Sequence, residues 1–240
     1  MTENTKPAEH SRENEGESRD PAQSILDFGS AMTRTDHGNI YCLTIIGQIE
    51  GHTTAPSTSK TTKYEHVLPL LVKLEESREV DGVLFLLNTV GGDVEAGLAI
   101  AELIAGMTKP TVSIVLGGSH SIGIPLAVAT DCSFIVLSAT MLAHPVRMSG
   151  TVLGAPQTYY QFNQMQERII GFICRHAAIK KTRLEELMLA KDTMAKDLGT
   201  ILVGEEAVNE GLISHVGSLG DAMLTLERMI AGKKTAQKDV

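Results

Sequence analysis

Cysteine is scarce in this sequence of 240 residues, and its three copies are far apart. Cys42, Cys132 and Cys174 lack the paired spacing that zinc sites and disulfide frameworks require. Each lies in an apolar run, so we predict buried, free thiols and no metal site. An odd number of thiols is typical of a reducing compartment, which makes the cytoplasm the expected location.

Long apolar runs are also missing. No stretch approaches the roughly 18 residues that a membrane-spanning helix needs. The opening residues, MTENTKPAEHSRENEGESRDP, are polar and charged, the opposite of a secretory signal peptide. We therefore expect a cytoplasmic protein, and peripheral contact with a membrane stays open.

Positive charge is in deficit, because 21 lysines and arginines face 29 aspartates and glutamates, for a formal net charge of −8. Nucleic-acid binding needs a concentrated basic face, so we exclude nucleic acid as the main partner. The G-x-x-x-x-G-K-[ST] pattern of nucleotide-binding loops does not occur either. We predict no cofactor, and any ATP would be used by a partner protein.

Composition divides the chain into three parts. Residues 1–37 are rich in Glu, Ser, Asn and Thr and cannot bury enough surface to offset the entropy of ordering, so we predict a disordered tail. A folded domain is expected over residues 38–231, where the hydrophobic residues suffice for a core. A basic tail is expected over residues 232–240.

Strand and helix patterns alternate through the first half. Short apolar runs predict strands over residues 39–49, 82–89, 111–117, 132–138 and 140–145. Helical spacing predicts helices over residues 66–77, 94–107 and 124–129. This alternation is typical of a parallel α/β sheet with right-handed crossovers.

The second half is mainly helical. An apolar stripe predicts a helix over residues 161–177, and Thr182 with Glu185 has the pattern of a capping box that opens the next helix. A short helix that stops at Gly211, a closing strand, and an amphipathic helix over residues 221–230 complete the expected fold.

The stretch VLGGSHSIGIPLA, residues 115–127, runs from a strand through a glycine turn into a short helix. A serine becomes a nucleophile when a base removes its proton and oriented amides stabilise the resulting oxyanion. Ser121 lies at this turn, where a helix N-terminus offers unpaired amides. The Gly-x-Ser-x-Gly elbow of α/β hydrolases is not satisfied, because Ser119 stands two positions earlier.

The base for Ser121 is not fixed by the residues alone. Ser119 is interpreted as satisfying local backbone groups, and His120 is poorly placed because neighbouring side chains in an extended turn diverge. His144 ends an apolar strand, where active-site groups are frequent. Composition does not rank it above the other candidates, His52, His66, His176 and His215.

Three segments together resemble the proteolytic subunits of the caseinolytic Clp proteases. They are LNTVGGDVEAGLAIAELIAGMTKPTVSIVLGGSHSIGIPLAVA, TMLAHP and GEEAVNEGLI, and the resemblance covers about three quarters of the chain, residues 39–216. It implies a ClpP/crotonase-like α/β spiral of ββα units, with a projecting helix near residues 161–190. It also implies a ring-forming homo-oligomer.

Carried over position by position, the resemblance makes Ser121 the nucleophile and His144 the general base. The N–H groups of Gly92 and Ile122 would form the oxyanion hole.

The acid of the triad falls just before residues 204–213. Asp197 is the nearest match, with Asp192 as the rival, and either would orient the imidazole of His144.

Several positions depart from the family pattern. The family's Ser-Pro-Gly-Gly is Thr89-Val90-Gly91-Gly92 here, and His120 replaces a small alanine before the nucleophile. The loop over residues 50–65 is longer than its counterpart in the family. These changes bear on the shape of the substrate groove and on assembly.

The resemblance thus predicts a serine endopeptidase that cleaves unfolded or short peptides by acyl-enzyme chemistry. Within the family it is strongest to members linked to protein export, so an unfoldase or the export machinery is the expected partner. Two alternatives stay open. A crotonase-type acyl-CoA enzyme shares the fold and the paired amides, but commonly uses glutamates that the GGSHSIG turn lacks. A catalytically degenerate scaffold subunit would keep the fold alone.

Overall fold

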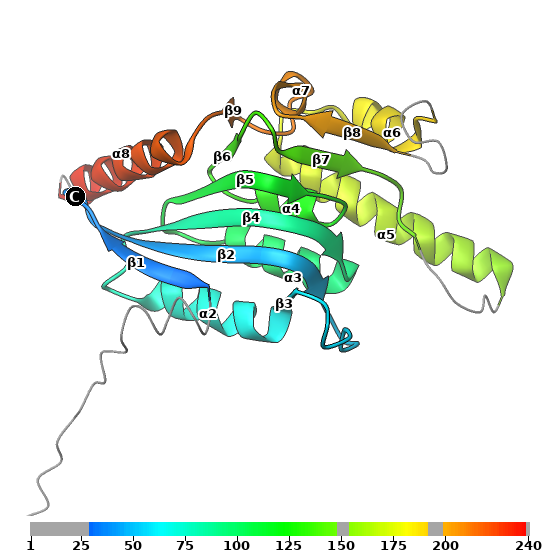
Figure 1. Cartoon of the computed structure of the whole chain (residues 1–240), viewed down its shortest axis with the longest axis horizontal. Helices are drawn as coiled ribbons and strands as arrows, with labels where there is room; N and C mark the ends of the chain where they lie inside the picture. The colour runs from blue at the N-terminus through cyan, green and yellow to red at the C-terminus, as the bar shows by residue number, and fades with distance from the viewer. Residues whose placement is uncertain (1–28, 148–153, 192–198, 239–240) are drawn as a thin grey trace, which may run out of the picture.

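A twisted, mostly parallel sheet forms the centre of the computed structural model, which describes residues 29–147, 154–191 and 199–238 (Figure 1). In this part of the chain the main strand order is β1-β2-β4-β5-β6-β9, with β3 beside β2 and β7 between β5 and β8. The strands are β1 Ser30–Arg34, β2 Asn39–Glu50, β3 Thr61–Lys63, β4 Gly82–Gly92, β5 Thr111–Ser119, β6 Cys132–Ile135, β7 Thr140–Ala143, β8 Thr200–Val203 and β9 His215–Val216.

Parallel pairing joins β2, β4, β5, β6 and β9, while β1 runs antiparallel to β2 and β8 antiparallel to β7. The central strands are covered on both faces, which is why they appear in the sequence as continuous apolar runs. The mixed α/β fold predicted from the sequence is therefore confirmed.

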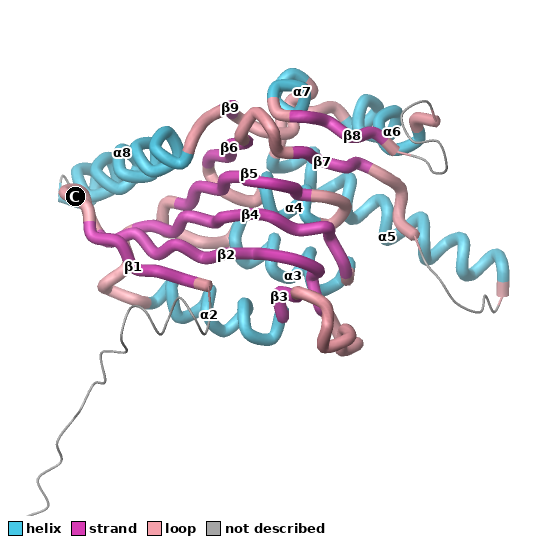
Figure 2. The backbone as a smooth tube through the Cα atoms, in the orientation of Figure 1, coloured by secondary structure: helices cyan, strands magenta, loops and turns pink. Residues whose placement is uncertain are grey.

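Helices cover both faces of the sheet (Figure 2). They are α2 Tyr64–Glu76, α3 Val94–Ala105, α4 Gly123–Val128, α5 Ala155–His176, α6 Lys181–Leu189, α7 Glu205–Asn209 and α8 Leu219–Lys238. None of the described helices has the length and apolarity needed to cross a membrane.

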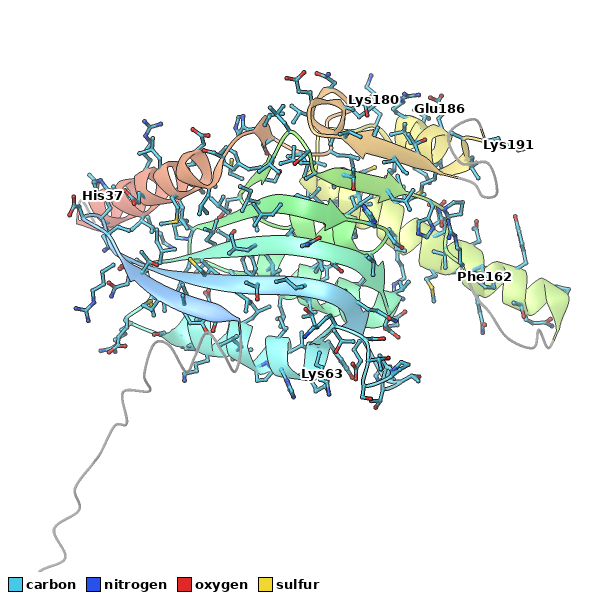
Figure 3. The ribbon with its side chains drawn as sticks, viewed as in Figure 1. His37, Lys63, Phe162, Lys180, Glu186 and Lys191 are labelled. Atoms are coloured by element: carbon cyan, nitrogen blue, oxygen red, sulfur yellow. The ribbon has the colours of Figure 1, made fainter. Side chains whose placement is uncertain are left out.

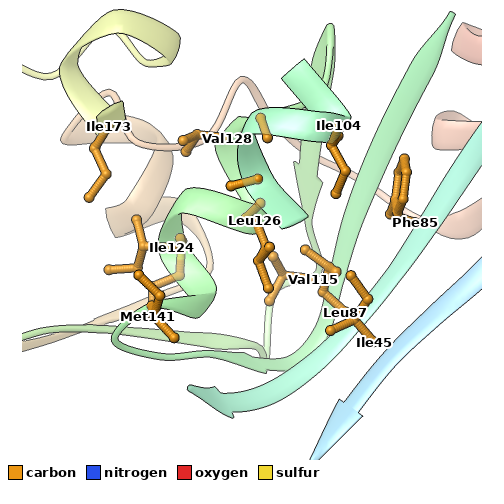
Figure 4. Close-up of a cluster of buried hydrophobic side chains, with 14 of the residues drawn as sticks. Ile45, Phe85, Leu87, Ile104, Val115, Ile124, Leu126, Val128, Met141 and Ile173 are labelled. Atoms are coloured by element: carbon orange, nitrogen blue, oxygen red, sulfur yellow. The ribbon is translucent and has the colours of Figure 1, made fainter. Parts of the chain in front are cut away.

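The two faces of the sheet carry separate cores. Phe85, Leu87 and Val115 point toward α2, α3 and α4 in the larger core, part of which Figure 4 shows. Leu84 alternates with Phe85 along β4 and packs with Leu226 of α8 in the smaller core. Since successive strand residues face opposite sides, α8 covers the face opposite α2, α3 and α4.

Helix α5 is buried along only part of its length. Its second half contributes Ile169, Phe172 and Ile173 to the larger core, whereas Tyr159 and Tyr160 near its start are 76% and 64% exposed. The first turns extend beyond the sheet at the right of Figure 1. The apolar stripe predicted over residues 161–177 is therefore core at its C-terminal end and partly exposed at its N-terminal end.

The predicted boundary of the N-terminal tail at residue 37 is wrong. Residues 30–34 form β1, which pairs with β2 through the backbone, and the hydroxyl of Tyr41 donates to Ser30 Oγ over 2.7 Å. Backbone pairing needs no apolar sequence, so composition could not reveal this strand. Residues 1–28 lie outside the described residues.

The predicted end of the folded domain at residue 231 is also wrong. Helix α8 continues to Lys238, so most of the predicted basic tail, residues 232–240, is helical. Lys233 donates to the carbonyl of Thr108, and Lys234 lies 2.8 Å from a carboxylate oxygen of Asp81. These contacts fasten the end of α8 to the loops at one edge of the sheet.

Two further details differ from expectation. The capping box is not formed, since Lys180 occupies the N-cap of α6 without a side-chain bond. The three cysteines are free but only partly buried, because they lie at the margins of the two cores. Partial burial raises the pKa of all three thiols.

The smaller core gives a test of how α8 is anchored. Leu226→Ala should lower the free energy of unfolding by about 2–5 kcal/mol, because it leaves a cavity in a fully buried site. Leu224→Ala, at a side chain that is 46% exposed on the same helix, should change it by less than about 0.5 kcal/mol. Urea denaturation measures both, and equal losses would contradict this placement of α8.

Candidate active site

The glycine pair at the end of β4 lets this strand approach the turn after β5. Gly91 and Gly92 have φ angles of 86° and 151°, so L side chains are strained at both. A Cβ on Gly91 would lie 2.7 Å from the carbonyl oxygen of His120 and 2.8 Å from Ser121 Cβ. The apolar run predicted that this strand ends at residue 89. Instead β4 continues through both glycines after a bulge in its pairing with β2.

Ser121 is held in a left-handed backbone conformation, with φ at 56°, and within the described ranges no other non-glycine residue has a positive φ. Such a conformation costs about 1–3 kcal/mol and persists only where the surroundings fix it. Here the amide of Ser121 donates to the carbonyl of Leu142 in β7 over 2.9 Å. The amide of His120 donates to the carbonyl of Thr89 in β4 over 3.1 Å. Bonds to two strands thus fix the turn.

The neighbours of Ser121 make other contacts. Ser119 is fully buried and its hydroxyl donates to the carbonyl of Gly123 over 2.7 Å, which confirms its predicted structural role. His120 Nε2 lies 2.8 Å from Thr140 Oγ1 in a hydrogen bond. Burial lowers the pKa of His120, and the charge of His144 lowers it further.

Four of the five residues predicted for the site line one cavity of about 160 Å³. They are Ser121, His144, Gly92 and Ile122. The remaining lining is mostly apolar and consists of Val94, Ile124, Ala143, Val146, Arg147, Ile169 and Met188. The end of β4, the turn after β5 and the end of β7, which are distant in sequence, each contribute part of this wall.

His144 follows β7 directly, and its ring orientation is defined by its neighbour. Nδ1 lies 2.7 Å from the carbonyl oxygen of Pro145. Because a carbonyl only accepts, Nδ1 carries the proton, and in the neutral ring the lone pair belongs to Nε2. The neutral ring can therefore accept a proton at Nε2.

The competing histidines lie elsewhere. His52 is bonded to Tyr64, His176 stacks on Phe172 and His215 lies beside Phe134. His66 is exposed on α2. None of these four lines the cavity, so the structure separates His144 from candidates that composition could not rank.

The turn leaves one amide unused by its own hydrogen bonds. The amides of His120, Ser121, Gly123 and Ile124 donate to backbone carbonyls, whereas none of these turn bonds in the described residues uses the amide of Ile122. The side chain of Ile122 is buried against α3, where a Cβ on Gly97 would lie 2.4 Å from its Cγ1. Packing against α3 therefore fixes Ile122 at the cavity wall.

Both candidates for the predicted acid lie between Lys191 and Gly199. Asp197 and its rival Asp192 both lie outside the described residues. The chain re-enters at Gly199, whose amide donates to the carbonyl of Ala190 over 2.9 Å. A Cβ on Gly199 would lie 2.9 Å from His144 Cβ. Gly199, two residues after Asp197, therefore lies directly beside His144.

A larger groove of about 920 Å³ lies next to the small cavity and shares Val146, Arg147 and Met188 with it. Its other walls come mainly from α5 and α6, including Phe162, which Figure 3 labels. Gln166 connects these walls, since its Oε1 accepts from the amide of Val146 over 2.9 Å and its Nε2 lies 3.0 Å from Met188 Sδ.

Sequence reasoning did not identify Gln166, Met188 or Arg147 as part of the site. Gln166 and Met188 lie on amphipathic helices, where their spacing indicates only a packed face. Within the described part of the chain, no group of three or more His, Cys, Asp or Glu side chains could hold a metal ion.

A family model described as Clp protease matches residues 39–219. The match includes β4, β5 and β7, whose C-terminal ends lead to the small cavity, and the chain belongs to the Clp protease family.

The similarity extends to individual proteins. The chain is 48% identical over 217 residues to the translocation-enhancing protein TepA of Halalkalibacterium halodurans, across 90% of this chain and 85% of that protein. The proteolytic subunit 1 of the ATP-dependent Clp protease of Chlamydia abortus is 29% identical over 60% of this chain and 73% of its own. Its counterpart in Protochlamydia amoebophila is 27% identical over 56% of this chain and 64% of its own.

Because β4 approaches the turn so closely, the stability of the fold should be sensitive to a side chain at Gly91. Gly91→Ala should destabilise the fold by more than about 1 kcal/mol, because the left-handed backbone and the contact with His120 both oppose a Cβ. Gly232→Ala is the matched control in α8, with nothing within 4 Å of the new Cβ. It should leave stability unchanged or raise it by up to about 1 kcal/mol. Thermal unfolding compares them, and an unaffected Gly91→Ala variant would contradict this geometry.

Proposed function

We propose that this protein is a serine endopeptidase that cleaves unfolded or short peptides through an acyl-enzyme. The observation that carries the proposal is the shared cavity of Ser121 and His144, beside Gly92 and Ile122. Membership of the Clp protease family supports the same reaction class.

In the proposed mechanism, Ser121 Oγ attacks the carbonyl carbon of the scissile peptide bond while His144 Nε2 takes its proton. The oxyanion that forms accepts hydrogen bonds from the amides of Gly92 and Ile122. The intermediate then collapses: the C–N bond breaks, the leaving amine takes the proton from His144, and Ser121 remains acylated. A water molecule, deprotonated by His144, hydrolyses the ester and restores the hydroxyl.

An acid behind His144 would complete the catalytic machinery. Asp197 is our candidate, with Asp192 as the alternative, and its carboxylate would stabilise the imidazolium that forms during attack. The position of Gly199 beside the Cα and Cβ of His144 supports an acid from the residues just before it. The bond from Nδ1 to the carbonyl of Pro145 already selects the required tautomer.

The larger groove and the small cavity support a peptide substrate. The larger groove gives an extended chain a path toward Ser121, and the small apolar cavity offers space beside the nucleophile. Walls that carry both apolar and charged side chains suit a peptide backbone with varied side chains.

Assembly and partners form part of the same proposal. Tyr159 and Tyr160 on the projecting end of α5 are exposed aromatics, which supports burial against another subunit in a ring-forming homo-oligomer. The similarity to a translocation-enhancing protein supports a role in protein export, with the export machinery or an unfoldase as partner. We propose the cytoplasm as the location, with any membrane contact at its surface.

A fluorophosphonate probe tests the assignment of the nucleophile. Such a probe should label Ser121, as located by peptide mass spectrometry, and labelling should fall by a factor of about 1,000 or more in His144→Ala, which lacks the base. His215→Ala is the matched control, since this ring lies outside the cavity. Labelling at Ser119, or unchanged labelling without His144, would sink the proposal. Absence of labelling together with a normal fold would favour the scaffold alternative.

The choice between the two acids is a separate prediction. Asp197→Asn should lower kcat by a factor of about 10² to 10⁴, because the imidazolium loses its counter-charge. Asp192→Asn serves as the matched control and should retain most of the wild-type activity. Hydrolysis of a fluorogenic peptide measures both variants, and the reverse order would assign the role to Asp192.

A further inference from the structure

We propose that His120 is a positioning residue of this active site, whose imidazole holds the start of β7 against the turn that carries Ser121 through its hydrogen bond with Thr140. The inference rests on the proposed role of Ser121 as nucleophile and adds a residue to the machinery that aligns it.

Few backbone hydrogen bonds join the two strands that lead to the reacting groups. Strand β5 leads to Ser121 and β7 leads to His144, yet their ladder consists of one pair, Gly118 opposite Thr140. The amide of Ser121 adds one bond to β7, at Leu142. With so few backbone bonds, one side-chain bond across this gap has a large share in fixing the separation of the two groups.

His120 supplies the shorter of two side-chain bonds here, since the hydroxyl of Thr140 also donates to the carbonyl of Gly117 over 3.5 Å. The Nε2 of His120 lies 2.8 Å from Thr140 Oγ1. The ring lies over Gly118, where a Cβ would be 3.0 Å from Nε2, so the glycine provides the space that the ring needs. The bond thus reinforces the single ladder pair at Thr140.

The main chain of the same residue is bonded on its other side. The amide of His120 donates to the carbonyl of Thr89 at the end of β4, and its carbonyl accepts from the amide of Gly123 over 2.8 Å. His120 therefore connects β4, the turn and β7, which are the three segments that surround Ser121. A strained residue needs this kind of over-determined neighbourhood to keep its conformation.

The ring is not placed to act as the base. His120 is absent from the lining of the cavity that Ser121 and His144 share. Its Nε2 is occupied by Thr140. Among the described titratable groups, His144 is the one whose charge acts on His120, and burial together with that charge lowers the pKa of His120. Both effects favour the neutral form of the ring.

The experiment removes the bond from either end and restores it conservatively. Thr140→Val deletes the hydroxyl at nearly constant volume, whereas Thr140→Ser keeps it; His120→Ala deletes the ring, whereas His120→Gln keeps a polar group at similar reach. Thr111→Val is the matched control, because Thr111 loses a comparable hydroxyl bond, to Asp131, at the opposite end of β5. Fluorophosphonate labelling of Ser121 and the separate kcat and KM of peptide hydrolysis are the readouts.

We expect Thr140→Val and His120→Ala to lower the labelling rate and kcat by a factor of about 10 to 100 with KM nearly constant, because a small misplacement of reacting groups has a cost of this size. Thr140→Ser, His120→Gln and Thr111→Val should stay within about threefold of the wild type, as expected where the alignment is kept. The acid limb of the pH profile should keep its midpoint in His120→Gln, since the base is His144.

Three results would overturn the inference: Thr140→Val labels as fast as the wild type, Thr111→Val loses as much rate as Thr140→Val, or His120→Gln abolishes both activity and the acid limb. The last result would make His120 the base.

Failure of the proposed function is recognised separately. If the wild type does not label at all, the peptidase proposal falls, and the ring resonances of His144 in NMR spectra then decide the inference. They should shift in Thr140→Val and remain in place in Thr111→Val, and unshifted resonances in both would overturn it.

Discussion

The left-handed backbone of Ser121 is the constraint on which the rest of the site depends. A side chain in this conformation projects from the end of β5 in a direction that a regular strand or helix does not offer. The conformation is unfavourable by itself, and it persists here because β4 and β7 each bind the turn through main-chain hydrogen bonds. The sheet order, with β4 and β7 on either side of β5, is what makes both bonds available.

Several features elsewhere in the fold serve this arrangement. Gly91 allows β4 to come within contact distance of the turn, and Gly97 allows α3 to pack directly on Ile122. Gln166 fastens the chain after His144 to α5 and α6. The two cores on opposite faces of the sheet keep the strand ends in register, so that residues at or after the ends of three strands share one small cavity.

Much of this could be predicted from the sequence, for physical reasons that differ between elements. Strands β4 and β5 are covered on both faces, so their apolar runs identified them, and β-branched residues identified β2. The turn at Ser121 was visible because glycine and serine cluster between a strand and a helix. His144 could not be chosen from residues alone, since its distinction from other histidines is purely tertiary; the family resemblance singled it out. Strand β1 was missed because backbone pairing leaves no apolar signature. The positive φ of Ser121 could not be predicted because it depends on tertiary hydrogen bonds, from the amide of Ser121 to Leu142 and from the amide of His120 to Thr89.

The most direct test of the account is a crystal structure of the assembled protein after reaction with a fluorophosphonate. The account predicts a phosphonyl group on Ser121 Oγ, with one of its oxygens about 2.7–3.1 Å from the amide nitrogens of Gly92 and Ile122. It also predicts His144 Nε2 on the same side of the adduct and a φ of Ser121 that remains positive. An adduct oxygen that points to solvent, with the imidazole of His144 turned away from it, would contradict the account.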